Sequence, residues 1–418
     1  MAVDNSRINS ISGFTGLGIA PSLLNVFAKL HYEKPTPIQQ QAIPVAISGK
    51  DVVGIAQTGT GKTLAFGVPM LQRLNQLHGK GLVVVPTREL AQQVDETLHS
   101  IASSFGLKTA VLIGGASMGL QLRALSRNPH IIVATPGRLN DILQQRKIRL
   151  DKVKVVVLDE ADRMLDMGFA PQIQKIFNAL PDDRQTMLFS ATMPHDIFKM
   201  ATNYMKLPIR IEVAPPGTTI DRVSQEIYII PAKSKGLLTE KILNQYHGPT
   251  LIFTRTKHGA KKLAQNIRNL GHSAVEIHSN RSLGQRREAM QGFKIGKYRV
   301  LIATDIASRG IDVAGIELVL NYDLPMNSED YIHRIGRTAR AGAGGHAISL
   351  VTPDQRKEVR DIERLMKKTL PVAESPDVPK ASFAAPAPYY TSQRRGRGSR
   401  SGGFGRRQGM HRKRYVSR

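Results

Sequence analysis

The sequence predicts two doubly wound α/β domains, each built on a parallel β-sheet that is covered by helices. The chain has 418 residues, which is more than one ordinary hydrophobic core accommodates. Short apolar runs recur along it and are continuous rather than alternating, as is typical of strands buried on both faces of a parallel sheet. The segments between these runs are long enough to form helices.

The apolar runs fall into two sets, and each set predicts the strands of one domain. The first set is Val52–Ala56, Leu82–Val85, Ile131–Ala134, Val155–Leu158 and Met187–Phe189. The second set is Glu226–Ile230, Leu251–Phe253, Ala274–Ile277, Val300–Ala303, Leu318–Leu320 and Ala347–Val351. Between them, residues 214–219 read Ala-Pro-Pro-Gly-Thr-Thr, which suits neither a helix nor a sheet interior. We therefore predict an N-terminal domain at 1–213, a linker at 214–220 and a C-terminal domain at 221–370.

The last segment, residues 371–418, is predicted to be a Pro/Ala-rich connector followed by a disordered basic tail. Residues 391–418 contain ten Lys or Arg and no Asp or Glu. Such a segment cannot bury enough apolar area to offset its ordering entropy. The tail is expected to bind nucleic acid regardless of sequence, with Phe404 and Tyr415 stacking on bases. Truncation at about residue 380 should weaken this binding to nucleic acid and leave the chemical activity of the folded domains intact. A purely solubilising tail is the alternative.

The overall charge favours a polyanionic partner. The formal net charge is +26, and without the ten cations of the tail 49 Lys and Arg still face 33 Asp and Glu. A membrane surface is the rival partner, but no apolar run approaches the ~20 residues of a spanning helix and no signal-peptide pattern is present. The tail also lacks the apolar face of an interfacial helix. The absence of cysteine excludes disulfides and thiolate metal sites, and we expect a cytoplasmic protein.

A candidate phosphate site follows the first apolar run. Residues 57–63 read Gln-Thr-Gly-Thr-Gly-Lys-Thr and lead into helix-capable sequence. Glycines let backbone N–H groups surround phosphate oxygens, and the helix N-terminus adds its positive end. Lys62 would then reach the β- and γ-phosphates, and the Thr63 hydroxyl would ligate Mg²⁺. Ala56 stands where the strict pattern has Gly, and an isolated Gly-Lys-Thr is also compatible with an ordinary turn.

An acidic pair ends a later apolar run, where residues 159–162 read Asp-Glu-Ala-Asp. Carboxylates at the end of a buried strand are costly unless they hold a cation or water. Asp159 suits coordination of Mg²⁺, and Glu160 suits orientation and deprotonation of the attacking water. A capped helix start is the simpler alternative, which the preceding phosphate loop makes the minor one.

Further blocks occur in a regular order along both predicted domains. They are Tyr32–Gln39, Pro86–Leu90, Gly114–Gly115, Thr135–Arg138, Ser190–Thr192, Leu251–Arg255, Ala303–Asp312 and His333–Arg340. With these blocks the chain, from about Phe14 to about Leu370, resembles the DEAD-box family of superfamily 2 RNA helicases, and most of all its bacterial RhlE-like branch. The resemblance implies two tandem RecA-like domains and an RNA-stimulated ATPase that uses ATP and Mg²⁺.

The resemblance also implies roles for individual residues at the ATP site. Phe14 would stack on adenine, Gln39 would read the adenine edge, and Asp312 would contact the ribose. The remaining phosphate-loop residues are Thr58, Gly59, Thr60 and Gly61. His333, Arg337 and Arg340 would be catalytic, with the two arginines acting as fingers on the γ-phosphate. A solvated basic helix face is the alternative reading of that last block.

RNA-binding and coupling residues are implied in the same way. Loops of this kind bind the sugar-phosphate backbone without reading bases. The implied RNA contacts are Pro86, Thr87, Arg88, Gly115, Thr135, Gly137, Arg138, Thr254, Arg286 and Thr304, with Arg255 also considered. The implied coupling residues are Asp162, Ser190, Thr192 and Arg309. A common strand–turn–helix junction is the structural alternative for residues 86–90, 114–115 and 135–138, and a simple Ser/Thr turn is the alternative for residues 190–192.

The sequence departs from the family pattern at several positions. His31 and Ala339 stand where the family usually has Gly, Ser279 replaces a usual Gly, and Leu283 occupies a usual Gln position. The last two departures predict that the second domain binds RNA more weakly, or through a shifted set of residues.

The expected mechanism divides one active site between the two domains, so ATP and RNA would each favour closure. Local strand bending would unwind short duplexes better than long ones, with the helix after Arg138 as a wedge. A DNA-directed motor of the same superfamily and a non-hydrolysing RNA clamp or annealing factor are the rival functions.

Overall fold

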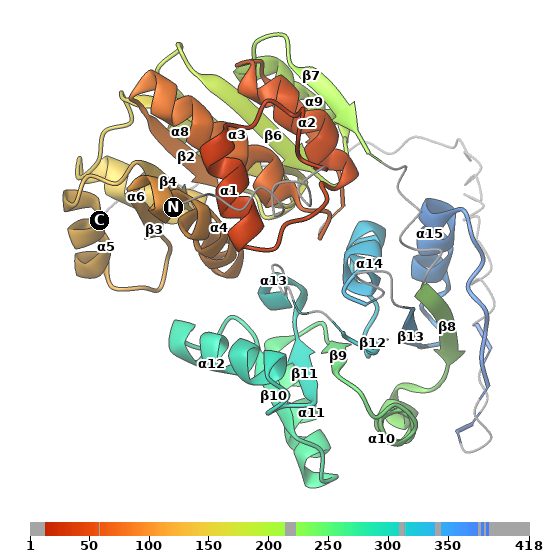
Figure 1. Cartoon of the computed structure of the whole chain (residues 1–418). Helices are drawn as coiled ribbons and strands as arrows, with labels where there is room; N and C mark the ends of the chain where they lie inside the picture. Colours follow the sequence, from red (N-terminus) through yellow and green to blue (C-terminus); the bar gives the residue numbers. More distant parts are fainter. Residues whose placement is uncertain are drawn as a thin grey trace, which may run out of the picture. The chain divides into compact units, whose positions relative to one another are not determined.

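Two parallel β-sheets organise the chain (Figure 1). The computed structural model describes residues 13–57, 59–213, 223–308, 313, 315–338, 344–374, 378–379 and 382–383. The first sheet has seven strands in the order β3-β4-β2-β5-β6-β1-β7, and the second has six in the order β10-β11-β9-β12-β13-β8. All these strands pair in parallel, so the predicted fold class is confirmed.

The first domain alternates strands and helices. Its strands are β1 (Val52–Ile55), β2 (Lys80–Val84), β3 (Thr109–Leu112), β4 (Ile131–Ala134), β5 (Val153–Asp159), β6 (Gln185–Ser190) and β7 (Ile209–Glu212). Its helices are α1 (Pro21–Lys29), α2 (Pro37–Ile47), α3 (Lys62–Leu77), α4 (Arg88–Ala102), α5 (Met118–Ser126), α6 (Pro136–Gln144), α7 (Ala161–Asp166), α8 (Ala170–Asn178) and α9 (His195–Tyr204), with a 3₁₀ turn η2 (Ser103–Phe105).

The second domain repeats this alternation. Its strands are β8 (Val223–Ile229), β9 (Thr250–Phe253), β10 (Ala274–Ile277), β11 (Val300–Ala303), β12 (Leu318–Asn321) and β13 (Gly345–Val351). Its helices are α10 (Lys235–Gln245), α11 (Lys257–Asn269), α12 (Leu283–Lys294), α13 (Asp305–Ser308), α14 (Ser328–Ile335) and α15 (Arg356–Met366), with a 3₁₀ turn η4 (Ala232–Ser234).

Every apolar run identified in the sequence overlaps a strand, whereas two strands were missed. The missed strands, β3 and β7, form the two edges of the first sheet. In β3 only alternate residues are buried, and in β7 only Ile211 is buried. An edge strand that leaves side chains in water does not need a continuous apolar run. The pattern that finds central strands therefore does not find these edges.

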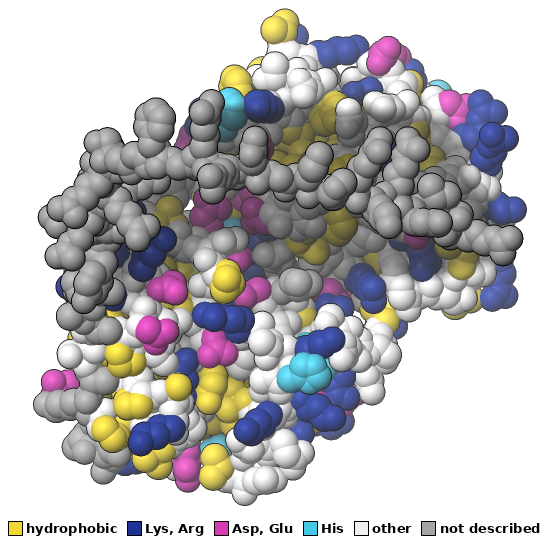
Figure 2. Space-filling view, turned by 180° about the vertical axis from the view of Figure 1, so that it is seen from behind, with side chains coloured by type: hydrophobic (Ala, Val, Ile, Leu, Met, Phe, Trp, Pro, Cys, Tyr) yellow, Lys and Arg dark blue, Asp and Glu magenta, His cyan; other side chains and the backbone are white. Residues whose placement is uncertain are grey.

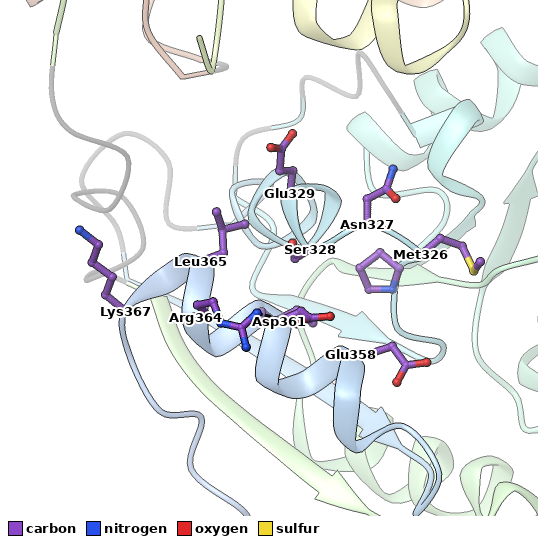
Figure 3. Close-up of a pocket in the computed structure, with 11 residues that line it drawn as sticks. Met326, Asn327, Ser328, Glu329, Glu358, Asp361, Arg364, Leu365 and Lys367 are labelled. Atoms are coloured by element: carbon purple, nitrogen blue, oxygen red, sulfur yellow. Dashed lines mark hydrogen bonds and ion pairs between the residues drawn. The ribbon is translucent and has the colours of Figure 1, made fainter. Parts of the chain in front are cut away.

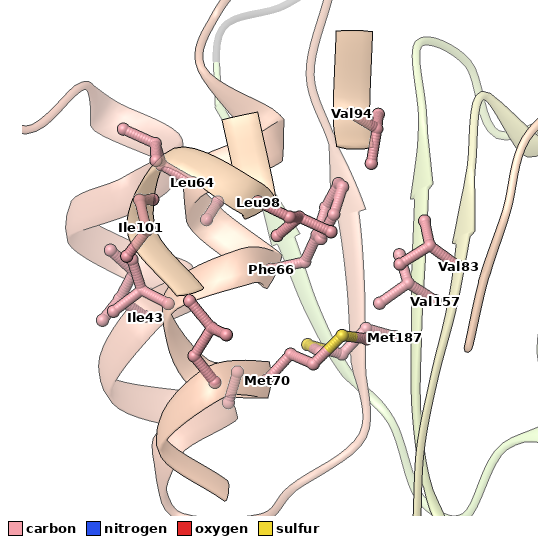
Figure 4. Packing of buried hydrophobic residues seen from close by; sticks show 14 of the residues in the cluster. Ile43, Leu64, Phe66, Met70, Val83, Val94, Leu98, Ile101, Val157 and Met187 are labelled. Atoms are coloured by element: carbon pink, nitrogen blue, oxygen red, sulfur yellow. The ribbon is translucent and has the colours of Figure 1, made fainter. Parts of the chain in front are cut away.

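Apolar side chains from both faces of each sheet pack against the covering helices. In the first domain one cluster lies under α2, α3 and α4 and includes Phe66, Met70, Val157 and Met187 (Figure 4). A second cluster on the other face includes Leu82 and Val156. Because neighbouring residues of one strand enter opposite clusters, the continuous apolar runs are explained by burial on both faces.

The chain continues beyond α15 along the edge of the second sheet. The amide of Ile227 in β8 donates to Pro371 O at 2.9 Å, and the amide of Ala373 donates to Ile227 O at 2.8 Å. Val378 is 4% exposed and belongs to one of the two second-domain clusters, and Phe383 packs against the other. The connector predicted from residue 371 thus begins with residues that pack on the second domain.

The boundaries of the predicted segments fall partly outside the described residues. The predicted linker at 214–220 and the basic segment 391–418 lie outside them, so both boundaries stay predictions. Among the described helices, none has the length and apolar character needed to cross a membrane. Figure 2 shows one face of the protein, on which Lys and Arg side chains are scattered among Asp and Glu.

Candidate nucleotide and RNA sites

The loop between β1 and α3 has the backbone conformation of a phosphate-binding loop. Gly59 and Gly61 have φ angles of 81° and 85°, a region that glycine enters without strain. Helix α3 begins at Lys62, so its N-terminal amides lie beside the loop. Lys62 is 6% exposed and its Nζ donates to Ala56 O at 3.0 Å. The buried lysine is therefore held against the loop, while Thr58 lies outside the described residues.

Gln39 connects the segment before α2 to this loop. Its Nε2 donates to Gly61 O at 3.0 Å, and its Oε1 accepts from the amide of Thr36 at 2.9 Å. A Cβ placed on Gly61 would lie 2.4 Å from Gln39 Nε2, so only glycine permits this contact. Each amide atom still has one unused hydrogen-bonding position, which is the capacity that adenine reading requires.

The acidic pair lies where β5 meets α7. Asp159 and Glu160 are 3% and 5% exposed, and Glu160 has a left-handed backbone with φ of 54°. Such strain in a residue other than glycine is typical of functional positions. Glu160 also accepts an ion pair from Arg163, at 3.3 Å between Nη1 and Oε2. Arg163 is 2% exposed and was missed in the sequence, although it directly follows the acidic block.

Burial raises the pKa of Asp159 to about 6, which the nearby Lys62 partly opposes and Glu160 reinforces. A divalent cation would remove this cost by stabilising the ionised carboxylate. The available donors, a carboxylate and the hydroxyl of Thr63, are hard oxygen ligands of the kind Mg²⁺ prefers. The residues therefore fit Mg²⁺.

A pocket of about 400 Å³ brings most of the predicted nucleotide residues together. It is lined by Phe14, Tyr32, Lys34, Thr36, Gln39, Gly59, Gly61, Lys62, Thr63, Leu64, Leu90, Gln93, Thr97, Asp159, Glu160 and Arg337. Arg337 is 4% exposed and its Nε donates to His333 O at 3.2 Å. Leu90 belongs to a block that was assigned to RNA rather than to the nucleotide. Gln93 and Thr97 were not expected here, because nothing in the sequence of α4 distinguishes them from ordinary helix residues. Asp312 and Arg340 lie outside the described residues.

Asp162 is bonded to the end of β6 through both its side chain and its backbone. Its Oδ2 accepts from the amides of Ala191 and Thr192 and from the Thr192 hydroxyl, at 3.0, 3.0 and 3.1 Å. Its own amide donates to Ser190 Oγ at 3.3 Å. Thr192 thus contacts the carboxylate through its hydroxyl, whereas Ser190 contacts the backbone instead. The expected coupling role of these residues stays a prediction.

The predicted RNA loops of the first domain converge at the carboxyl ends of β2, β3 and β4. Thr87 caps α4 by accepting from the amide of Leu90 at 3.2 Å. Gly115 has a φ of 76°, and a Cβ there would lie within 2.3 Å of Arg88 Nη1. Arg138 donates to Ala116 O at 3.3 Å. The convergence places two guanidinium groups and exposed backbone at one edge of the sheet, as backbone binding requires.

A second pocket, of about 350 Å³, is lined by seven of the predicted RNA contacts. They are Pro86, Thr87, Arg88, Thr135, Gly137, Arg138 and Arg286. Arg286 is 7% exposed, and its Nη2 lies 2.9 Å from Glu89 Oε1. The charge of Arg286 is therefore already paired here. Thr254 and Thr304 are not among the lining residues, and Arg309 lies outside the described residues.

A third pocket, of about 800 Å³, lies away from these residues between α15 and the start of α14 (Figure 3). Met326, Glu329, Glu358, Asp361 and Leu365 are among its lining residues. Of the residues predicted from the sequence, none that the structure describes lines this pocket. Volume alone therefore does not identify the functional site.

The phosphate loop, the acidic pair and the two parallel sheets define a nucleotide-hydrolysing motor of the tandem RecA-like class. Two family models match the chain, the DEAD/DEAH box helicase at residues 36–200 and the helicase conserved C-terminal domain at residues 233–342. The chain belongs to the DEAD-box family of ATP-dependent RNA helicases.

The similar proteins agree with this assignment. The ATP-dependent rRNA helicase RRP3 of Debaryomyces hansenii is 43% identical over 90% of this chain and 79% of its own length. The RRP3 protein of Saccharomyces cerevisiae strain S288c is 43% identical over 87% and 73%. Among solved structures, S. cerevisiae Dbp5 bound to RNA and ADP BeF3 has a TM-score of 0.79 at 29% identity, covering 86% of this chain and 95% of that one. Mss116p bound to ssRNA and AMP-PNP has a TM-score of 0.80 at 28% identity, covering 89% and 81%.

Proposed function

We propose that this protein is an RNA-stimulated ATPase that closes on ATP and RNA and locally unwinds short RNA duplexes or remodels RNA–protein complexes. The observation that carries the proposal is the pocket in which Gln39, Lys62, Asp159 and Glu160 meet. A buried lysine beside two buried carboxylates has the charges that a metal-bound triphosphate requires.

Each of these residues has a separate proposed task. Lys62 binds the β- and γ-phosphates, and Asp159 with Thr63 holds Mg²⁺, which supplies charge neutralisation of the phosphates when bound. Glu160 orients the attacking water and accepts its proton. Arg337, with Arg340 as its predicted partner, stabilises charge on the γ-phosphate, an effect worth roughly 10³–10⁵ in rate.

The RNA is proposed to lie along the loops that carry Arg88, Gly115 and Arg138. These groups contact phosphates and sugars, so binding is expected to be independent of sequence. The basic tail adds affinity through counterion release. Ribosomal RNA is the proposed substrate class, because relatives 43% identical to this chain are named as rRNA helicases. The assignment to the RhlE-like branch is likewise a proposal, supported by the sequence motifs rather than by these relatives.

The ATP site is tested by ATP hydrolysis with and without RNA. Lys62→Ala should abolish RNA-stimulated turnover, while Lys199→Ala, which removes an exposed lysine of α9, should leave it unchanged. Arg337→Ala should reduce turnover at saturating ATP with little loss of ATP affinity. RNA-stimulated turnover by Lys62→Ala would overturn the proposal. Equal stimulation by single-stranded DNA and by RNA would instead indicate a motor that does not select RNA.

A further inference from the structure

The two domains repeat a single topology, which allows their elements to be matched one to one. The first six strands of the first domain lie in the order β3-β4-β2-β5-β6-β1. The second sheet has the order β10-β11-β9-β12-β13-β8, which is the same order once β8 is counted as the first strand. Strand β8 therefore corresponds to β1, and β12 corresponds to β5.

This match pairs the phosphate-binding lysine with a lysine of the second domain. Helix α3, after β1, begins at Lys62, and helix α10, after β8, begins at Lys235. The two lysines are 6% and 5% exposed. Strand β5 ends at Asp159, beside Lys62, and its counterpart β12 is followed two residues later by Asp323. The second domain thus keeps a lysine and an aspartate at the positions of a phosphate site.

The loop before Lys235 cannot surround a phosphate. Residues 230–234 read Ile-Pro-Ala-Lys-Ser, without glycine, and no residue of the described segment 230–235 has a positive φ. The ammonium group of Lys235 instead donates to Tyr322 O at 2.6 Å and to Asp323 Oδ1 at 3.1 Å. It also lies 5.3 Å from the centre of the Tyr322 ring. A carboxylate of the protein itself is therefore the anion that neutralises this lysine.

Asp323 also forms hydrogen bonds with the end of β9 and with the loop that follows it. Its Oδ2 accepts from the amide of Arg255 at 3.1 Å, and its own amide donates to Phe253 O at 3.2 Å. Arg255 follows Thr254, the proposed RNA contact of this loop. The side chain of Lys235 is 6% exposed and that of Asp323 is 30% exposed, so the pair is shielded from water more than a surface ion pair is.

We propose that Lys235 and Asp323, which occupy the positions that correspond to the phosphate site of the first domain, are positioning residues that fix the loop of residues 254–257 for binding of the RNA backbone. The inference rests on the proposed RNA contact of Thr254. Asp323 accepts a hydrogen bond from the Arg255 amide, and Lys235 orients the Asp323 carboxylate through its own hydrogen bond. Removing either partner leaves the other with an unpaired charge and releases the loop.

The variants Lys235→Met and Asp323→Asn test the inference in the full-length protein. Each should raise the RNA concentration for half-maximal ATPase activity about tenfold, which corresponds to the loss of one charge-assisted contact. The KM for ATP and the rate at saturating RNA should not change. Amide hydrogen exchange should become faster in residues 254–257 and stay the same in α3. Lys262→Met, which removes an exposed lysine of α11, is the matched control and should change none of these values.

Two further variants separate the possible outcomes. The double variant Lys235→Met/Asp323→Asn removes both charges together, so it should fold even if a single variant does not, and it should show the same loss of RNA affinity. Thr254→Val reports on the RNA contact itself. If Thr254→Val weakens RNA binding while the Lys235 and Asp323 variants do not, the positioning role is wrong and the RNA contact stands. If Thr254→Val has no effect, the RNA contact is wrong and the positioning role falls with it.

Discussion

Arg334 of α14 donates two hydrogen bonds to the carboxylate of Asp305, at 2.6 Å from Nε and 2.8 Å from Nη2. The arginine is 2% exposed, and its Nη1 also donates to Asn321 Oδ1 at 3.0 Å and to Asp323 O at 2.6 Å. Asp305 directly follows Thr304, a proposed RNA contact, and Arg337 follows Arg334 by about one helical turn. This ion pair therefore joins the loop proposed to contact RNA to the segment that carries the proposed arginine finger.

Breaking this pair should destabilise the second domain. Arg334→Met removes the two hydrogen bonds that Arg334 donates to the Asp305 carboxylate, and a broken buried ion pair costs on the order of 3 kcal/mol in unfolding free energy. Urea unfolding followed by circular dichroism measures the change. The control is Arg364→Ala, because Arg364 pairs with Asp361 at 3.1 Å while 80% exposed, and its loss should cost less than about 1 kcal/mol. Equal unfolding free energies of the two variants would show that the Arg334–Asp305 ion pair does not stabilise the second domain.

The residues expected to contact the nucleotide could be predicted from the sequence, whereas the buried contacts that support the site could not. Lys62, Asp159 and Glu160 belong to loops whose chemistry can be deduced from residue type and spacing. Arg334 was not singled out, because a buried arginine and a solvent-exposed arginine look the same in a helix. Its partners Asp305 and Asn321 are 29 and 13 residues away, and only the topology of the sheet brings them together. A local sequence pattern therefore cannot predict such a contact between residues that are distant in the chain.

The prediction of strands from apolar runs also succeeded only in part. Central strands such as β4 are buried on both faces and appear as apolar runs, whereas the edge strands β3 and β7 do not. A sequence pattern reports burial, and burial is lowest where a sheet ends. Pro371 and Ala373 at the start of the connector bond to β8, and this contact between distant residues does not follow from a Pro/Ala-rich composition.

The pH dependence of stability should report the raised pKa of Asp159, which lies at about 6 against an ordinary value of 3.8. A carboxyl group with a raised pKa stabilises the metal-free fold in its protonated form. Its contribution is complete below about pH 4 and is lost as the pH rises through about 6, on the order of 3 kcal/mol in total. Asp159→Asn should therefore gain stability relative to the wild type between about pH 4 and 7. Denaturant unfolding without Mg²⁺ measures this, and a constant difference across the range would contradict a raised pKa.

Replacement of His31 by glycine should stabilise the first domain. His31 follows α1 with a φ of 58°, its amide donates to Ala28 O at 3.2 Å, and the amide of Tyr32 donates to Phe27 O at 3.0 Å. These bonds form a Schellman motif, in which glycine is favoured at the left-handed position. His31→Gly should raise the unfolding free energy by about 0.5–1 kcal/mol without changing ATP hydrolysis. Thermal unfolding measures the gain, and His31→Ala at the same position should show none.

The tail is best tested by truncation after Phe383 rather than at about residue 380. Val378 is 4% exposed and Phe383 packs on the second domain, so a cut before them removes packing as well as charge. A protein ending at Phe383 should keep its thermal stability and its ATPase rate at saturating RNA. It loses all ten cations of residues 391–418, so its affinity for RNA should fall. The slope of log affinity against log salt should also become shallower, by about 0.7 for each single-strand phosphate that the tail had neutralised.

A protein ending at Leu370 is the control for packing and should lose stability as well as affinity. Identical salt slopes for the full chain and the protein ending at Phe383 would show that the tail binds no phosphate.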